Sequence, residues 1–125
     1  MTKPRRPDPI YTTSGDVGAF MIHPFIYSQT GEWAGWVTPD DDVYSVIGNY
    51  IGFLSDDHRI LRKRSYDYSK PRIHPPQPRP RIRVPSISPL PPMMAELPFT
   101  TIDVLDWEPH RLSTLDFDEL REDMD

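Results

Sequence analysis

Two acidic clusters and four histidines are the side chains of this chain that could bind a metal ion. Asp40–Asp42 and Asp56–Asp57 could hold a hard cation through carboxylate oxygens, but their spacing matches no calcium loop. We therefore interpret both clusters as solvated turn residues. Cysteine is absent, which excludes a disulfide framework and a cysteine-bound zinc site. We expect no metal or other cofactor, because the histidines are scattered along the sequence at His23, His58, His74 and His110.

The residue pattern also does not predict catalysis. A nucleophilic enzyme needs a serine or cysteine beside a positioned base, and no serine here lies in a recognisable catalytic turn. A phosphate-binding loop needs glycines directly before a helix, whereas these glycines separate short apolar runs. We therefore expect a protein that is not an enzyme.

The strongest pattern is a 17-residue repeat that pairs residues 26–38 with residues 43–55. An apolar run, a polar turn and a second run form each unit, which is typical of a β-hairpin. The glycines are expected at bulges or at positive φ angles. The large rings could form a ligand-stacking platform, but their equivalent positions favour packing between hairpins. The repeat residues are Gly31, Trp33, Gly35, Trp36, Gly48, Tyr50, Gly52 and Phe53.

The repeat predicts an all-β head over residues 10–68, preceded by an N-terminal arm, residues 1–9. Cut from Gly15, the chain gives three units, 15–30, 31–47 and 48–64, and two fragments remain outside them: Ile10–Thr13 and Ser65–Tyr68. Paired as a fourth hairpin, they would close a small ring of about four repeated hairpins and remove exposed strand edges.

The motifs of the head resemble a known family. Gly31-x-Trp33-x-Gly35-Trp36 recurs as Gly48-x-Tyr50-x-Gly52-Phe53, and Arg59-Ile60-Leu61 follows. On these motifs, residues 10–68 resemble the bacterial 4-fold β-flower domain family. The first unit departs from the pattern, because Val17 and Ala19 replace aromatic residues. The resemblance implies a closed ring of hairpins, and it brings no catalytic residues.

Residues 69–98 are predicted to be a proline-rich basic linker. Ten of the 16 prolines lie between Pro71 and Pro98, a density that excludes helix and inner strand and favours either an extended polyproline II form or disorder. From Arg59 to Arg83, nine Lys and Arg residues against one acid give a charge of +8. Contacts to nucleic acid or to an acidic partner are therefore assigned to Arg62, Lys63, Arg64, Arg79, Arg81 and Arg83.

Residues 99–125 are predicted to be an acidic partner-binding tail. Ten acids against two arginines between Glu96 and Asp125 give a charge of −8. A short helix is expected over 113–124, capped by Ser113 and Thr114. The head is too small to bury all the apolar residues of this tail, so we expect them to dock on a partner. They are Phe99, Ile102, Leu105, Trp107, Leu115, Phe117 and Leu120.

These features predict a non-enzymatic adaptor or accessory subunit of a bacterial protein complex. The protein would dock on a partner protein through its proline-rich and acidic C-terminal tail. The alternative is a nucleic-acid-associated accessory protein that uses the basic stretch 59–83, although the acidic tail would compete for it. The N-terminus has no apolar region of the kind that directs secretion. No run of apolar residues in the sequence is long enough to cross a membrane. We expect a cytoplasmic location.

Overall fold

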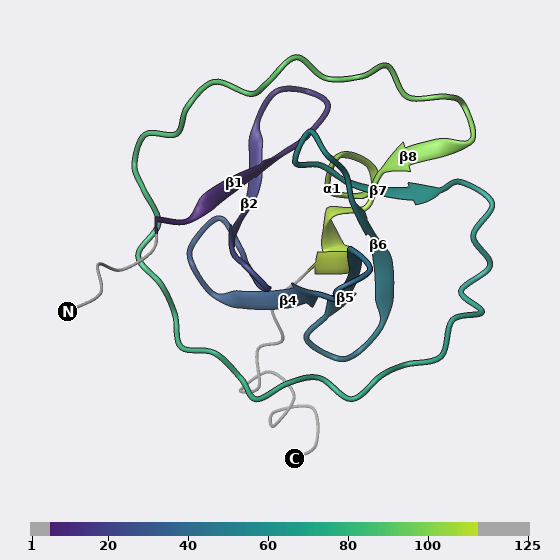
Figure 1. Cartoon of the computed structure of the whole chain (residues 1–125), viewed down its shortest axis with the longest axis horizontal. Coiled ribbons are helices and arrows are strands. Elements are labelled where there is room, and N and C mark those ends of the chain that lie inside the picture. Colours follow the sequence, from purple (N-terminus) through teal and green to yellow (C-terminus); the bar gives the residue numbers. More distant parts are fainter. Residues whose placement is uncertain (1–5, 113–125) are drawn as a thin grey trace.

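Residues 6–112, described by a computed structural model, form one antiparallel eight-stranded sheet in which each strand pairs with the next along the chain (Figure 1). The all-β prediction is confirmed, and the sheet curls into an open half-barrel. A short helix α1 (Val104–Trp107) and a 3-10 turn η1 (Pro109–Leu112) follow the last strand. The strands are β1 (Asp8–Tyr11), β2 (Val17–Ile22), β3 (Phe25–Tyr27), β4 (Trp33–Val37), β5 (Asp42–Ser45), β6 (Tyr50–Leu54), β7 (Ile60–Lys63) and β8 (Thr101–Asp103).

Five turns between the strands share one hydrogen-bond pattern. Each begins with a Ser or Thr whose Oγ accepts the N–H of the residue four positions on, and these residues are Thr12, Ser28, Thr38, Ser45 and Ser55. The fourth residue of each turn has a positive φ angle, which glycine adopts without a steric cost. Gly31 at +91° and Gly48 at +88° confirm this part of the prediction.

The second pair of repeat glycines serves a different purpose. Gly35 and Gly52 lie inside β4 and β6, where a Cβ would overlap a carbonyl oxygen of the neighbouring strand. The strand register shifts beside each of them, which leaves Ala34 and Ile51 as the extra residues of two β-bulges. Ala34 and Ile51 are 17 residues apart, so the repeat is a repeat of turns and bulges.

The core follows the same repeat. Ile10, Ile26, Val43 and Ile60 hold equivalent places in successive hairpins, and all four are fully buried. Beside this aliphatic core, Trp33 and Trp36 are buried in a second cluster with Tyr27, Tyr44 and Val46. The packing interpretation is confirmed for Trp33 and Trp36, with Trp36 and Tyr44 stacked at 5.6 Å between centroids, whereas Tyr50 and Phe53 are half-buried.

The predicted closure of the sheet is wrong. β1 pairs with β2 rather than with Ser65–Tyr68, and β7 pairs with β8, which comes from the tail. β8 supplies Ile102 to the buried interior and Asp103 to a polar network, whereas Ser65–Tyr68 contains no aliphatic residue to bury. The sheet stays open between β1 and β8. The Thr13 N–H, just after β1, donates across this gap to the Asp103 carboxylate on β8 at 2.7 Å, and the Tyr11 N–H donates to the His58 carbonyl oxygen in the turn before β7 at 2.8 Å.

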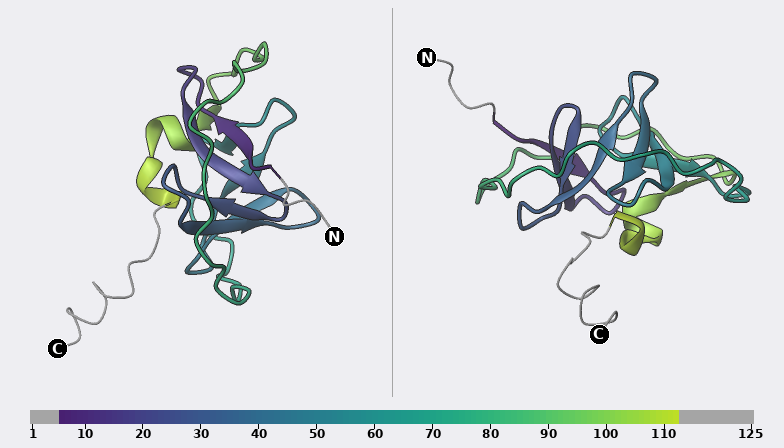
Figure 2. Two further views of the ribbon diagram at one scale, coloured as in Figure 1. Left: turned by 90° about the vertical axis from the view of Figure 1, so that its left-hand side faces the viewer. Right: turned by 90° about the horizontal axis from the view of Figure 1, so that it is seen from below.

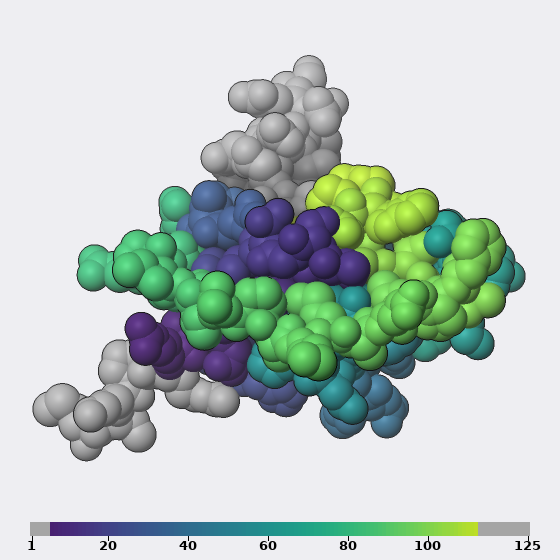
Figure 3. All heavy atoms as spheres, turned by 90° about the horizontal axis from the view of Figure 1, so that it is seen from above, coloured from purple at the N-terminus to yellow at the C-terminus, as the bar shows by residue number. Residues whose placement is uncertain are grey.

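Residues 69–98, which we call the strap, run around the outside of the sheet without forming helix or strand (Figures 1 and 2). The extended form was therefore predicted correctly. Its path was not predicted, because the strap lies against the head; Figure 3 shows its later part, in green, packed against the N-terminal strands in purple. Partial burial recurs at every third residue from Ile82 to Leu97, the period of a polyproline II helix.

Two equivalent contacts set the register of the strap. The Ile73 N–H donates to the Gly48 carbonyl oxygen at 3.0 Å, and the Ile82 N–H donates to that of Gly31 at 2.9 Å. Arg72 and Arg81, one residue earlier, donate to the carbonyl oxygens of Ile47 and Thr30. A nine-residue step along the strap thus matches a 17-residue step along the head. Further along, the Tyr11 hydroxyl donates to the Pro89 carbonyl oxygen at 2.8 Å.

Several predictions fall outside the part of the chain that the structure describes. They are the helix over 113–124 and the partner-binding residues Leu115, Phe117 and Leu120. Within residues 6–112, neither length nor hydropathy makes any helix a membrane span.

Candidate functional site

The outer side of the strap carries a row of exposed apolar residues. Ile87, Leu90 and Met93 are 82%, 90% and 98% exposed and follow one another at intervals of three. The residue that directly follows each of them is partly buried, and these residues are Ser88, Pro91 and Met94. The strap therefore presents one apolar edge to solvent, which we call the outer strap face and define as Ile87, Leu90 and Met93.

A second exposed apolar feature lies where the strap enters β8. Phe99 is 81% exposed and Trp107 is 63% exposed. The guanidinium carbon of Arg64 lies 4.4 Å from the Phe99 ring centroid and 4.7 Å from that of Trp107, and Arg64 Nε donates to the Phe99 carbonyl oxygen at 2.7 Å. Cation–π contacts of this kind hold both rings in place. We call Arg64, Phe99 and Trp107 the aromatic clamp.

The predicted partner-binding residues are thus divided between core and surface. Ile102 and Leu105 are buried in the head, so their apolar character is explained by folding. Phe99 and Trp107 remain at the surface. The exposed row of the strap itself was not among the predicted residues, although the three-residue spacing within a proline-rich segment was a signal for it.

The predicted basic contacts are largely used within the chain. Arg62 is buried and its Nη1 donates to Glu108 at 2.5 Å, while Arg64 belongs to the aromatic clamp. Arg81 donates to Thr30, and Arg79 lies 4.4 Å from the Phe25 ring centroid. The two remaining residues, Lys63 and Arg83, are exposed. These cations therefore act mainly as attachments between segments.

A buried ion pair joins the strap to the head. The Arg59 side chain is 1% exposed and donates from Nε and Nη2 to the two carboxylate oxygens of Asp57, at 3.0 and 2.6 Å. Its remaining donors reach the Thr13 hydroxyl at 2.9 Å and the Ala95 carbonyl oxygen at 2.8 Å. The Arg59 hydrogen bond lowers the pKa of Asp57 from 3.8 to about 2, against the opposing effect of burial. Thr13 in turn donates to Asp103 on β8.

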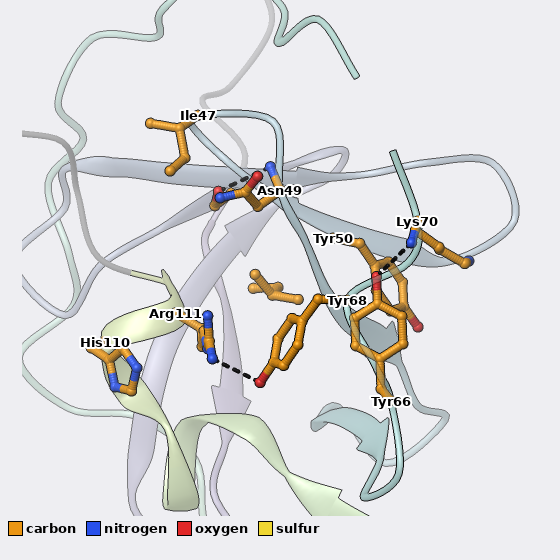
Figure 4. Close-up of a pocket in the computed structure, with 10 residues that line it drawn as sticks. Ile47, Asn49, Tyr50, Tyr66, Tyr68, Lys70, His110 and Arg111 are labelled. Atoms are coloured by element: carbon orange, nitrogen blue, oxygen red, sulfur yellow. Dashed lines mark hydrogen bonds between the residues drawn. The ribbon is translucent and has the colours of Figure 1, made fainter. Parts of the chain in front are cut away.

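A pocket of about 440 Å³ lies near the first part of the strap (Figure 4). We call it the tyrosine pocket. Three segments build it: the β5–β6 turn, the chain after β7, and η1. Its lining residues are Ser45, Ile47, Asn49, Tyr50, Ile51, Tyr66, Tyr68, Lys70, His110 and Arg111.

Tyrosine rings form a continuous row along this pocket. Tyr50 and Tyr66 meet edge to face at 5.1 Å between centroids, and Tyr66 and Tyr68 meet in the same way at 5.1 Å. The Lys70 ammonium lies 4.2 Å from the Tyr50 ring centroid, and the Arg111 guanidinium carbon lies 4.5 Å from that of Tyr68. The three rings therefore form a row with one cation at each end.

The protonation states of the pocket are governed by burial and by neighbouring charges. Burial raises the pKa of the Tyr50 hydroxyl, although the charge of Lys70 partly opposes this. For Lys70, burial is the largest single effect and lowers the pKa, but the hydrogen bond to Asp42 at 3.3 Å and the charge interactions with Asp42, Tyr50 and Tyr44 together outweigh it, so the pKa is raised. Lys70 is therefore positively charged and Tyr50 is neutral near pH 7.

The Arg111 side chain has a donor that is not used. Its Nη2 donates to the Tyr68 hydroxyl at 2.7 Å (Figure 4) and lies 3.7 Å from Glu108. Its Nε is buried and finds no acceptor among residues 6–112. Sequence reasoning missed this pocket, because its three segments are far apart in the chain and no motif links them.

Comparison of the chain with family models, with curated proteins and with solved structures gave no match. The arguments for function therefore rest on the geometry described above.

Proposed function

We propose that this protein is a non-enzymatic adaptor or accessory subunit of a bacterial protein complex, and that a protein partner docks on the outer strap face. The observation that supports this most is the exposure of Ile87, Leu90 and Met93 in a row of period three. Proteins rarely expose large apolar residues in a contiguous set unless a partner covers them. An extended proline-rich segment is also a familiar ligand for grooves lined with aromatic residues, because little entropy is lost when it is bound.

The aromatic clamp extends the proposed surface. Phe99 and Trp107 are held by Arg64, so their burial by a partner would cost little side-chain entropy. Tryptophan and arginine are the residue types that most often dominate binding energy at interfaces. The partner would then contact both the strap and the residues that follow it.

Nucleic-acid binding through the basic stretch is the weaker proposal. It would need a row of free guanidinium and ammonium groups that follows a phosphate backbone. Arg62 and Arg64 instead serve internal contacts, and the acidic residues 116–125 would compete for any cation that is free.

The β-flower resemblance also remains a proposal. The bulges at Ala34 and Ile51 support a repeated ancestry of the hairpins, and the four equivalent core residues Ile10, Ile26, Val43 and Ile60 support a four-part arrangement. A closed ring would need further contacts across the gap between β1 and β8.

The experiment begins with a photo-crosslinking residue at position 90 of the full chain in its native host, followed by identification and purification of the crosslinked protein. The affinity of that protein is then measured for wild type, Leu90→Asp and Met93→Asp. We expect each substitution to weaken binding by about tenfold or more, because a charge would replace a buried apolar contact.

The control is Ser86→Asp, which adds the same charge at an exposed polar position of the same strap. It should change the affinity by less than about twofold. If wild type and all three variants bind the partner with equal affinity, the outer strap face is not the docking surface.

A further inference from the structure

We propose that the tyrosine pocket binds a small planar anion, a molecule that joins a flat ring to a phosphate or carboxylate group. The site is separate from the outer strap face, and the inference does not depend on the adaptor function.

The charges that line the pocket favour an anion. The ionisable side chains of the lining include the cations Lys70 and Arg111 and no carboxylate. The nearest acids, Asp42 and Glu108, contact these cations but lie outside the lining. A cage of tyrosine rings alone would suit a cationic ligand, but here the cations beside the rings would repel one.

The unused donor of Arg111 gives the anion a specific partner. A buried N–H without an acceptor costs free energy, and buried polar groups in folded proteins are nearly always satisfied. The Arg111 side chain is partly exposed and lines the pocket, so this Nε belongs to a group that a ligand in the pocket would contact. A phosphate or carboxylate oxygen placed there would accept a charge-assisted hydrogen bond.

The rings account for the flat part of the ligand. Tyr50 and Tyr66 are half-buried and Tyr68 is exposed, so parts of their surfaces remain available for contact inside the pocket. Stacking on such side chains favours the binding of flat rings, as it does for bases in nucleic-acid complexes. A volume of about 440 Å³ lies within the usual range for small-molecule sites and suits one or two fused rings with an anionic group.

The two halves of the proposed ligand can be tested apart by calorimetry on the full chain. Adenosine monophosphate and benzoate carry both ring and anion, adenosine carries the ring alone, and inorganic phosphate and acetate carry the anion alone. We expect at least one planar anion to bind with a Kd below about 1 mM, and each half alone to bind about tenfold more weakly or not at all. Which planar anion binds will distinguish a phosphate ligand from a carboxylate ligand.

Variants place the binding in this pocket. Arg111→Met and Tyr68→Leu should each raise the Kd of the planar anion by about tenfold. Arg83 is an exposed arginine outside the pocket, so Arg83→Met should leave this Kd unchanged. Should Arg111→Met fail to fold, backbone amide shifts of the wild-type chain on titration provide the same test, with the largest changes expected at Asn49, Tyr68 and His110. The proposal is overturned if neither planar anion binds at about 5 mM. It is also overturned if adenosine binds as well as its monophosphate while benzoate does not bind, or if the amide shifts lie outside the pocket.

Discussion

Replacement of Asp57 by asparagine should destabilise the protein strongly, because Asp57 neutralises the buried Arg59. The Asp57 carboxylate accepts two hydrogen bonds from Arg59, and the side chain of Asp57 is 16% exposed. An asparagine can present one oxygen, so its amide group would face a donor of Arg59 or of Ser55. Removal of one partner of a buried ion pair costs about 3 to 5 kcal/mol. Since Asp57 keeps some contact with solvent, we expect about 3 kcal/mol at pH 7.

Part of this loss should depend on pH, and its direction follows from the pKa of Asp57. The Arg59 hydrogen bond lowers that pKa from 3.8 in the unfolded chain to about 2 in the folded chain. The resulting stabilisation is present above about pH 4 and is lost as the pH falls toward 2. At about 1.4 kcal/mol per pKa unit, reduced for partial exposure, it amounts to about 1 to 2 kcal/mol. The difference between wild type and Asp57→Asn should therefore narrow by that amount in acid.

The assay is urea unfolding followed by tryptophan fluorescence at several pH values between 7 and 2.5. Asp56→Asn is the matched control, because Asp56 is the neighbouring acid and is exposed. It should change the free energy of unfolding by less than about 0.5 kcal/mol. The reasoning is refuted if Asp57→Asn is as stable as this control, or if its deficit is the same at pH 7 and pH 2.5.

Two further substitutions test the strap contact and the origin of β8. Gly31→Ala should destabilise the protein by about 1 kcal/mol more than Gly15→Ala. Both glycines have a positive φ, but only at Gly31 would the new Cβ overlap the Ile82 carbonyl oxygen; equal losses in thermal unfolding would contradict the strap register. Ile102→Ala should cost about 2 to 5 kcal/mol of unfolding free energy in urea, whereas Ile87→Ala should cost less than about 0.5 kcal/mol. A small loss at Ile102 would mean that β8 does not belong to the sheet.

The hairpin repeat could be predicted because turns and bulges need particular residues. A positive φ favours glycine at Gly31 and Gly48, and close strand approach excludes a Cβ at Gly35 and Gly52. These backbone requirements recur at every unit and leave a periodic trace in the sequence. The all-β class and the burial of Trp36 followed from the same trace.

The last strand could not be predicted in this way. β8 has three residues, and Ser65–Tyr68 lies much closer in sequence to the open edge of β7. The entropy cost of closing a loop rises only slowly with its length, so a strand that follows the long strap can still take this place. The side chains of β8 determine that this strand pairs with β7, because Ile102 is buried in the interior and Asp103 accepts a hydrogen bond from Thr13.

The path of the strap could not be predicted from the sequence for a related reason. Its attachment depends on single backbone hydrogen bonds at Ile73 and Ile82, and on arginines that resemble a solvated basic stretch. The tyrosine pocket could not be predicted without this path, because two of its lining residues, Tyr68 and Lys70, come just before the first attachment at Ile73. Composition alone could indicate an extended segment, but it could not indicate what the segment lies on.

The central claim is that the strap lies in a fixed register on the head and so presents its outer face. Amide hydrogen exchange followed by NMR tests this most directly. The amides of Ile73 and Ile82 should exchange at least about 100-fold more slowly than in a free peptide, because each donates to a head carbonyl oxygen. The amides of Arg83 and Ile87, which find no acceptor among residues 6–112, should exchange at nearly the free rate. Equal and fast exchange at all four amides would contradict the account.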